Sequence, residues 1–163
     1  MKKTASAFGL MITLYLLTAC QTSNPTSTPA PSNTPGQTQT PSKIPFVAAG
    51  SDITVSLPVG DPERGQQVAG ARDCVNCHAN GIGPVWVASE GLPGLGDRAA
   101  ERILQSDYTG TALTAEQYLF ESIALPNVYI VEGYPKGLMP DRFGDLVSAQ
   151  DMADIIAYLL TYR

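Results

Sequence analysis

The pattern of hydrophobic and polar positions is clearest near the end of the chain, where apolar residues recur at helical spacing. They are Met152, Ile155, Ile156, Leu159 and Leu160. Residues at this spacing share one face of a helix and can pack together on a core. Ser148 is a suitable N-cap for this helix, and Asp151 would lie in its first turn, where the helix dipole favours a negative charge. The pattern therefore predicts a final helix that begins after Ser148.

Two earlier segments carry helix-start signals. In Asp61-Pro62-Glu63 an acidic N-cap precedes a proline at the first helical position, which predicts a helix that leads into Cys74. The run Thr114-Ala115-Glu116-Gln117 matches a capping box and opens a helix that Pro126 stops. We expect a shorter helix over residues 98–105.

Two long segments between these helices read as loops. Residues 80–97 and 126–147 are rich in Gly and Pro, which favour turns over regular elements. No strand-rich region and no strand–helix alternation is found in the sequence. The pattern predicts an all-α domain over residues 61–163, with about three to five helices joined by long loops. A domain of about 100 residues with such loops has a thin core of its own.

The start of the chain has the features of an export signal. Lys2 and Lys3 precede the mostly apolar run at residues 8–17. This run is shorter than the roughly 20 apolar residues that span a bilayer, so we interpret residues 1–19 as a signal peptide that is removed. The alternative is an uncleaved N-terminal anchor.

A polar segment separates the signal from the predicted domain. Residues 20–45 are mostly Thr, Ser, Pro, Asn and Gln, and such a composition cannot bury enough apolar surface to order itself. We therefore expect a disordered tether there. In the lead-in at residues 46–60, Ile53, Val55 and Leu57 alternate with polar residues, which suggests a short extended segment.

The residues at the end of the signal, Leu17-Thr18-Ala19-Cys20, resemble the lipobox of bacterial lipoproteins. The resemblance implies that Cys20 becomes the first mature residue and carries a lipid on its sulfur. Two or more acyl chains hold a protein on a membrane, whereas a single chain binds only marginally. The lipid would also explain a third cysteine in an exported protein. The expected location is the periplasm or the outer face of the cell membrane, with the lipid as anchor.

The charge of the chain argues against some partners. The full sequence has a formal net charge of −5; without residues 1–19, which include Lys2 and Lys3 but no acid, 8 Lys and Arg face 15 Asp and Glu, which gives −7. Nucleic acids and anionic lipid surfaces are bound by basic patches, so an acidic domain is a poor match for them. The acidity favours a partner with a positive docking face, or it serves solubility alone.

The strongest chemical signal is Cys74-Val75-Asn76-Cys77-His78. Cys-x-x-Cys-His is the attachment pattern of c-type haem: each thiol forms a thioether with a vinyl group, and the histidine lies under the iron. A zinc site would need four ligands, and the remaining cysteine is assigned to the lipid. A thioredoxin-like pair expects a βαβ context, and a plain disulfide leaves His78 unexplained. We expect one covalent haem c, whose apolar surface would complete the thin core.

The second axial ligand of this haem cannot be histidine, because His78 is the only one in the chain. A methionine thioether is the natural candidate, since soft ligands suit haem iron and Met/His ligation raises its potential. Met152 lies on the apolar face of the last helix, where core packing explains it. Met139 lies in the loop Gly137-Leu138-Met139-Pro140, where it belongs to no apolar helix face. We predict that Met139 is the second ligand.

With these residues identified, the chain from residue 61 onward resembles class I cytochrome c. The order is the same: first helix, Cys-x-x-Cys-His, loop, middle helix, Met-Pro loop and last helix. The resemblance implies that the last helix crosses the first at Gly65, with Tyr158 packed over it. Ala69 departs from the pattern, because the family often has an aromatic residue there. Residues 122–140 are especially similar to cytochrome c domains fused to oxidase subunit II.

The resemblance also implies roles around the haem. Pro84 would accept a hydrogen bond from the ring N–H of the proximal histidine and fix its orientation. Leu92 and Leu95 would wall the haem, and Arg98 would reach a propionate. A turn proline, core leucines and a solvated arginine are the alternatives.

If the protein fills both axial positions of the haem iron, no coordination site is left for a small-molecule substrate. We therefore expect an electron carrier and not an enzyme. Its partners would be the membrane, through the lipid on Cys20, and redox proteins of respiratory or photosynthetic complexes. A lipid-anchored cytochrome of this size resembles the small monohaem subunit of alternative complex III, a quinol-oxidising assembly. The alternative is a haem enzyme or gas sensor in which Met139 is displaced.

Overall fold

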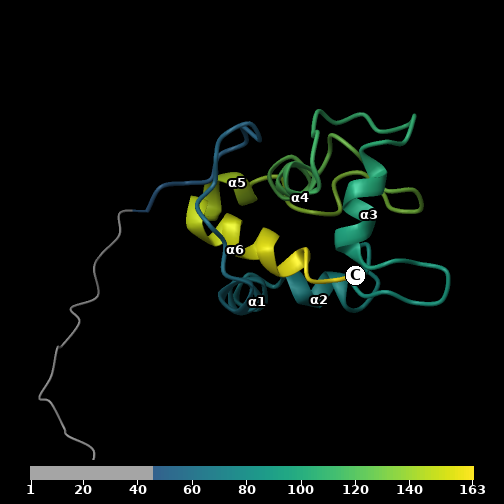
Figure 1. Ribbon diagram of the computed structural model, residues 1–163, viewed down its shortest axis with the longest axis horizontal. Coiled ribbons are helices and arrows are strands. Elements are labelled where there is room, and N and C mark those ends of the chain that lie inside the picture. The colour runs from purple at the N-terminus through teal and green to yellow at the C-terminus, as the bar shows by residue number, and fades with distance from the viewer. Residues whose placement is uncertain (1–45) are drawn as a thin grey trace, which may run out of the picture. The chain divides into compact units, whose positions relative to one another are not determined.

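Six helices form the secondary structure of residues 46–163, the part of the chain that the computed structural model describes (Figure 1). They are α1 (Pro62–Ala71), α2 (Cys74–His78), α3 (Leu95–Arg102), α4 (Ala115–Ala124), α5 (Phe143–Leu146) and α6 (Ala149–Leu159). Within these residues there is no strand, only two isolated bridges, Ala48 with Ser148 and Ser89 with Leu92. The predicted all-α class is confirmed, although two single-turn helices raise the number of helices to six. The expected signal peptide, Cys20 and the tether lie outside the described residues.

The most extensive packing between two helices of residues 46–163 is that of α1 against α6 (Figure 1). The two helices cross at Gly65. A Cβ placed on Gly65 would lie 1.9 Å from the carbonyl oxygen of Asp154 and 2.8 Å from the Cβ of Tyr158. Only a residue without a side chain permits this approach of two backbones. The predicted crossing is therefore confirmed, and Ala69 packs fully buried one turn further along α1.

Asp154 joins the start of α1 to α6 through hydrogen bonds. Its side chain is fully buried and accepts bonds from the backbone N–H of Asp61 at 2.8 Å and from Gln150 Nε2 at 2.9 Å. Arg64 forms an ion pair with Asp154 and a second one with Asp151. A buried carboxylate is costly unless it is paired and hydrogen-bonded, and here both conditions are met.

The predicted helix starts agree with the structure at three places. Asp61 accepts from the N–H groups of Glu63 and Arg64, Thr114 accepts from Gln117, and Ser148 accepts from Asp151. The short helix expected over residues 98–105 instead begins at Leu95 and ends at Arg102. Within the segment expected to be loop throughout, residues 143–146 form α5.

The lead-in at residues 46–60 is less regular than the alternation of its residues suggests. It contains a turn at residues 53–54, so that Ile53 is buried while Val55 is exposed. Ala49 is buried too, and its N–H donates to the carbonyl of Val147 at 2.9 Å. The segment therefore packs through single residues and not as a strand.

None of the helices in residues 46–163 has both the length and the apolar character that a membrane span requires.

Candidate functional site

A cavity of about 310 Å³ lies between α2, α3, α4, α6 and the loop that precedes α5. We call it the central cavity, and its wall is mostly apolar. Its volume is within the roughly 300–1,000 Å³ of cofactor and small-molecule sites. Most of the residues singled out in the sequence line it: Cys74, Cys77, His78, Pro84, Leu95, Arg98 and Met139.

The two cysteines reach the cavity from α2. Cys74 and Cys77 are three residues apart, so they lie on one face of this short helix. The chain turns into α2 at Asp73, whose φ of 60° is in the left-handed region that aspartate tolerates better than most residues. The sulfurs of Cys74 and Cys77 are not bonded to each other. Burial raises the pKa of the Cys74 thiol, so the neutral form is favoured at this wall.

His78, at the end of α2, is held on two sides. Its Nδ1 is 2.7 Å from the carbonyl oxygen of Pro84, so Nδ1 carries the proton and donates. The imidazole also stacks on the indole ring of Trp86, with centroids 4.9 Å apart and planes 21° from parallel. Burial lowers the pKa of His78, and the bond to Pro84 opposes this shift. The result is a neutral imidazole whose Nε2 has no hydrogen-bond partner within residues 46–163.

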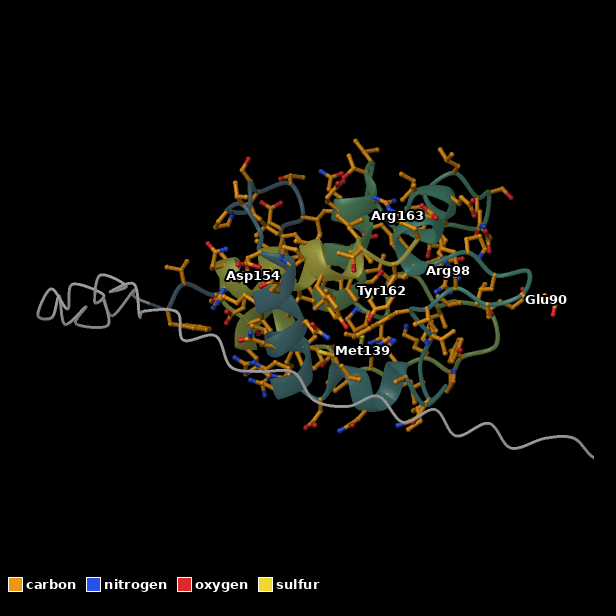
Figure 2. All side chains as sticks on the ribbon, turned by 60° about the horizontal axis from the view of Figure 1, so that its bottom comes forward. Glu90, Arg98, Met139, Asp154, Tyr162 and Arg163 are labelled. Carbon is orange, nitrogen blue, oxygen red and sulfur yellow. The ribbon has the colours of Figure 1, made fainter. Side chains whose placement is uncertain are left out.

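Met139 comes from a separate loop, which we call the strap (residues 137–140). Gly137 begins the strap with a φ of 78°, and its N–H donates to Asn127 Oδ1 at 2.8 Å. This bond ties the strap to the chain segment that follows α4. Figure 2 labels Met139 on the strap and Arg98 on α3, two walls of the same cavity. Met152, by contrast, is fully buried in the core, as its position on the apolar face predicted.

One expected wall residue is placed differently. Leu92 is not among the residues that line the central cavity, whereas Leu95 is. Leu92 instead exchanges two backbone hydrogen bonds with Ser89, at 2.9 and 3.0 Å. These bonds close a tight loop before α3. The expectation that Leu92 walls the haem is corrected, because Leu95 lines the cavity and Leu92 does not.

Comparison with known proteins agrees with this geometry. A family model for cytochrome c matches residues 62–163. The chain belongs to the cytochrome c family. No curated protein and no solved structure matched it. Membership implies covalently bound haem c, for which Cys74 and Cys77 provide the thioether pattern, and a role in haem-based electron transfer.

The residues of the central cavity fit this cofactor. The wall is apolar, as the macrocycle requires, and it contains one buried polar atom without a partner, the Nε of Arg98. Arg98 is only 7% exposed, and its Nη2 donates to the carbonyl of Val85. Burial, and secondarily the charge of Arg102, lowers the pKa of Arg98. A buried cation with an unpaired N–H is matched by an anionic group such as a haem propionate.

Several aromatic residues of this cytochrome site were not anticipated as site residues from the sequence. Trp86, Tyr118, Tyr129 and Tyr134 all line the central cavity. The rings of Tyr118 and Tyr129 lie edge to face with centroids 6.4 Å apart, and the guanidinium of Arg102 lies 5.8 Å from the centroid of Tyr129. Trp86 is the only tryptophan of the chain and follows His78 by eight residues, which is the one signal that could have drawn attention to it.

Proposed function

We propose that this cytochrome is a single-haem electron carrier in which His78 and Met139 are the two axial ligands. The observation that carries the proposal is that both side chains line one apolar cavity, although they come from α2 and from the strap. When bound, haem c supplies an iron that cycles between ferrous and ferric states. A protein that fills both axial positions offers no open site to a substrate, so electron transfer is the chemistry that such a site supports.

The roles of the protein follow from its contacts. Pro84 holds the His78 ring by accepting from Nδ1, which leaves Nε2 for the metal. Asn127 holds the strap through Gly137 and so positions Met139. Arg98 provides a buried positive charge for a propionate, and the apolar wall excludes water. Exclusion of water and a thioether ligand both raise the reduction potential of a haem.

Replacement of the proposed sixth ligand tests the ligation. In Met139→Leu we expect loss of the red-region charge-transfer band of the ferric protein, a lower reduction potential and carbon monoxide binding to the reduced form. Met152→Leu is the matched control, because Met152 is a fully buried core residue and its replacement should leave the band intact. If the unmodified protein lacks the band and binds carbon monoxide readily, the function is that of a haem enzyme or gas sensor.

We further propose that a lipid on Cys20 attaches the protein to the outer face of the cell membrane. The lipobox-like residues 17–20 and the apolar run before them support this, and the polar residues 21–45 would serve as tether. A tethered carrier has a high effective concentration near membrane complexes without any added contact. Detergent phase separation tests the proposal: the unmodified protein should enter the detergent phase, and Cys20→Ser should remain in the aqueous phase.

The proposed partners are respiratory or photosynthetic complexes, and specifically a quinol-oxidising assembly of the alternative complex III type, in which this chain would be the small monohaem subunit. The excess of 15 acidic over 10 basic residues supports a partner with a positive docking face. Purification from native membranes in mild detergent tests it. Recovery of the haem protein together with other subunits supports complex membership, whereas recovery alone indicates a free lipoprotein carrier.

A further inference from the structure

The imidazole of His78 is restrained by more than its hydrogen bond. The bond to Pro84 acts on one atom at the edge of the ring, whereas Trp86 lies against a face of the ring, 4.9 Å between centroids and 21° between planes. Trp86 is 8% exposed, so it is a buried wall and not a surface side chain. Offset stacks of this kind are favourable beyond the area they bury.

The rings of two tyrosines also pack against the indole of Trp86. The ring of Tyr158 lies edge-on to the indole at 6.1 Å and 89°, and the ring of Tyr162 lies at 6.0 Å and 51°. The two phenol oxygens are 2.5 Å apart and share a hydrogen bond. The indole therefore lies between the imidazole of His78 and two tyrosines, one in α6 and one just after it.

The backbone fixes this arrangement to the start of α3. The N–H of Leu95 donates to the carbonyl of Trp86 at 2.9 Å, and the N–H of Gly96 donates to the carbonyl of Tyr162 at 2.8 Å. Gly94 allows the last residues of the chain to approach, because a Cβ there would lie 2.5 Å from the carbonyl carbon of Tyr162. Trp86 and Tyr162 are thus both hydrogen-bonded to the first turn of α3. Figure 2 labels Tyr162 together with Arg98 of α3.

We propose that Trp86, backed by Tyr158 and Tyr162, is a positioning residue that sets the orientation of the His78 ring plane about its bond to the iron. The inference rests on the haem ligation proposed above and goes beyond it, because ligation needs only Nε2. Pro84 restrains one ring atom, whereas Trp86 restrains the face of the ring. Groups around a metal-bound histidine fix its ring orientation, and their loss changes the properties of the metal site. The ligand plane governs the magnetic anisotropy of a ferric haem, which the haem methyl resonances report.

The test is proton NMR of the ferric holoprotein. In Trp86→Leu we expect the haem methyl resonances to shift and change their spacing, while the charge-transfer band of the methionine ligand remains. Trp86→Phe keeps a ring on the imidazole and should restore most of the original pattern. Phe120→Leu is the matched control, because Phe120 is a buried aromatic residue that does not line the central cavity. The haem methyl resonances of this variant should match those of the unmodified protein.

An unchanged methyl pattern in Trp86→Leu would overturn the inference, and so would a pattern in Trp86→Phe displaced as far as in Trp86→Leu. If Trp86→Leu yields no holoprotein, Tyr162→Leu carries the test, since it removes one support of the indole and should shift the same resonances in the same direction by less. An unchanged pattern there also overturns the inference. Absence of the methionine band in the unmodified protein contradicts the proposed ligation instead, so the two failures are distinguishable.

Discussion

At the scale of single residues, two glycines of α1 differ sharply in what surrounds them. Gly65 faces the backbone of α6, whereas a Cβ on Gly70 would meet nothing within 4 Å. In Gly65→Ala the new methyl would overlap the carbonyl of Asp154, and backbone cannot move aside as a flexible side chain can. We expect the free energy of unfolding of the holoprotein to fall by about 3 kcal/mol, the upper range for overpacking. Denaturant titration measures this.

Gly70→Ala on the same helix is the control. Its side chain would point into open space, and alanine is the better helix former, so stability should rise by about 0.5–1 kcal/mol. Equal losses in both variants would show that α1 tolerates no alanine for reasons other than the crossing with α6.

The phenol of Tyr162 gives a residue-scale prediction about pH. Burial, and then the hydrogen bond with Tyr158, raises the pKa of Tyr162 to about 12. In the unfolded chain a tyrosine ionises near pH 10, so the folded state holds the proton more tightly. Its contribution to stability is fully present below about pH 10 and is lost as the pH rises toward 12. The free energy of unfolding should therefore fall over this range less steeply in Tyr162→Phe than in the unmodified protein; identical slopes would contradict the assignment.

At the scale of elements, Glu121 links α4 to the loop at residues 103–113. This carboxylate is 3% exposed and accepts hydrogen bonds from the hydroxyl of Tyr108, from the N–H of Thr111 at 2.8 Å and from its Oγ1 at 3.0 Å. Glu121→Ala would remove the acceptor for three donors at once. We expect a loss of about 2–3 kcal/mol in the free energy of unfolding and faster amide hydrogen exchange in the loop.

Glu116→Ala tests whether the effect belongs to the link or to α4 in general. Glu116 is exposed in the first turn of the same helix, where its charge interacts with the helix dipole alone. Its loss should cost less than about 1 kcal/mol and leave exchange in the loop unchanged. Similar losses in both variants would argue against a specific role for Glu121.

The elements that the sequence predicted well are those whose ends have local signals. Asp61, Thr114 and Ser148 cap α1, α4 and α6 because a side-chain oxygen next to a helix start satisfies free N–H groups, wherever the helix lies in the fold. The start of α3 has no such signal: Gly94 caps it without a side chain, and Gly96 lies in its first turn. That helix begins where the last residues of the chain pack onto it, which is a tertiary cause.

The residues of the candidate site also divide into those with a local sequence signal and those placed by tertiary structure. Cys74, Cys77 and His78 could be named from the spacing of their motif, and Met139 from its Gly and Pro neighbours in a loop; the structure brings all four to one cavity. The place of Trp86 in the wall could not be predicted, because the path of the loop at residues 80–94 determines which of its side chains turns inward. Trp86 is buried whereas the next residue, Val87, is 56% exposed.

At the scale of the whole domain, the central cavity lies where a small protein would have its core. Buried residues of α3, α4 and α6 line it, including Leu95, Leu119 and Ile155, and the strap covers one side. The packing between α1 and α6 is different, because it depends on the Gly65 crossing and on Asp154, and neither touches the cavity. The domain therefore has one part held by helix packing and another part held by whatever fills the cavity.

Removal of the cofactor should separate these two parts. In Cys74→Ser/Cys77→Ser, from which haem can be extracted, the apolar wall would face water, and burial of that surface is the main favourable term in folding. We expect loss of the cooperative thermal transition and rapid amide exchange in α3, α4 and the strap, with residual helical signal from α1 and α6. Asn80→Ala, which removes an exposed hydrogen bond to the carbonyl of Asn76, is the control that should keep haem and the transition. Circular dichroism and hydrogen exchange measure both. A haem-free variant that melts cooperatively and keeps native amide exchange in α4 would contradict this prediction. The protein core alone would then keep the cavity open, and the haem would not be part of the core.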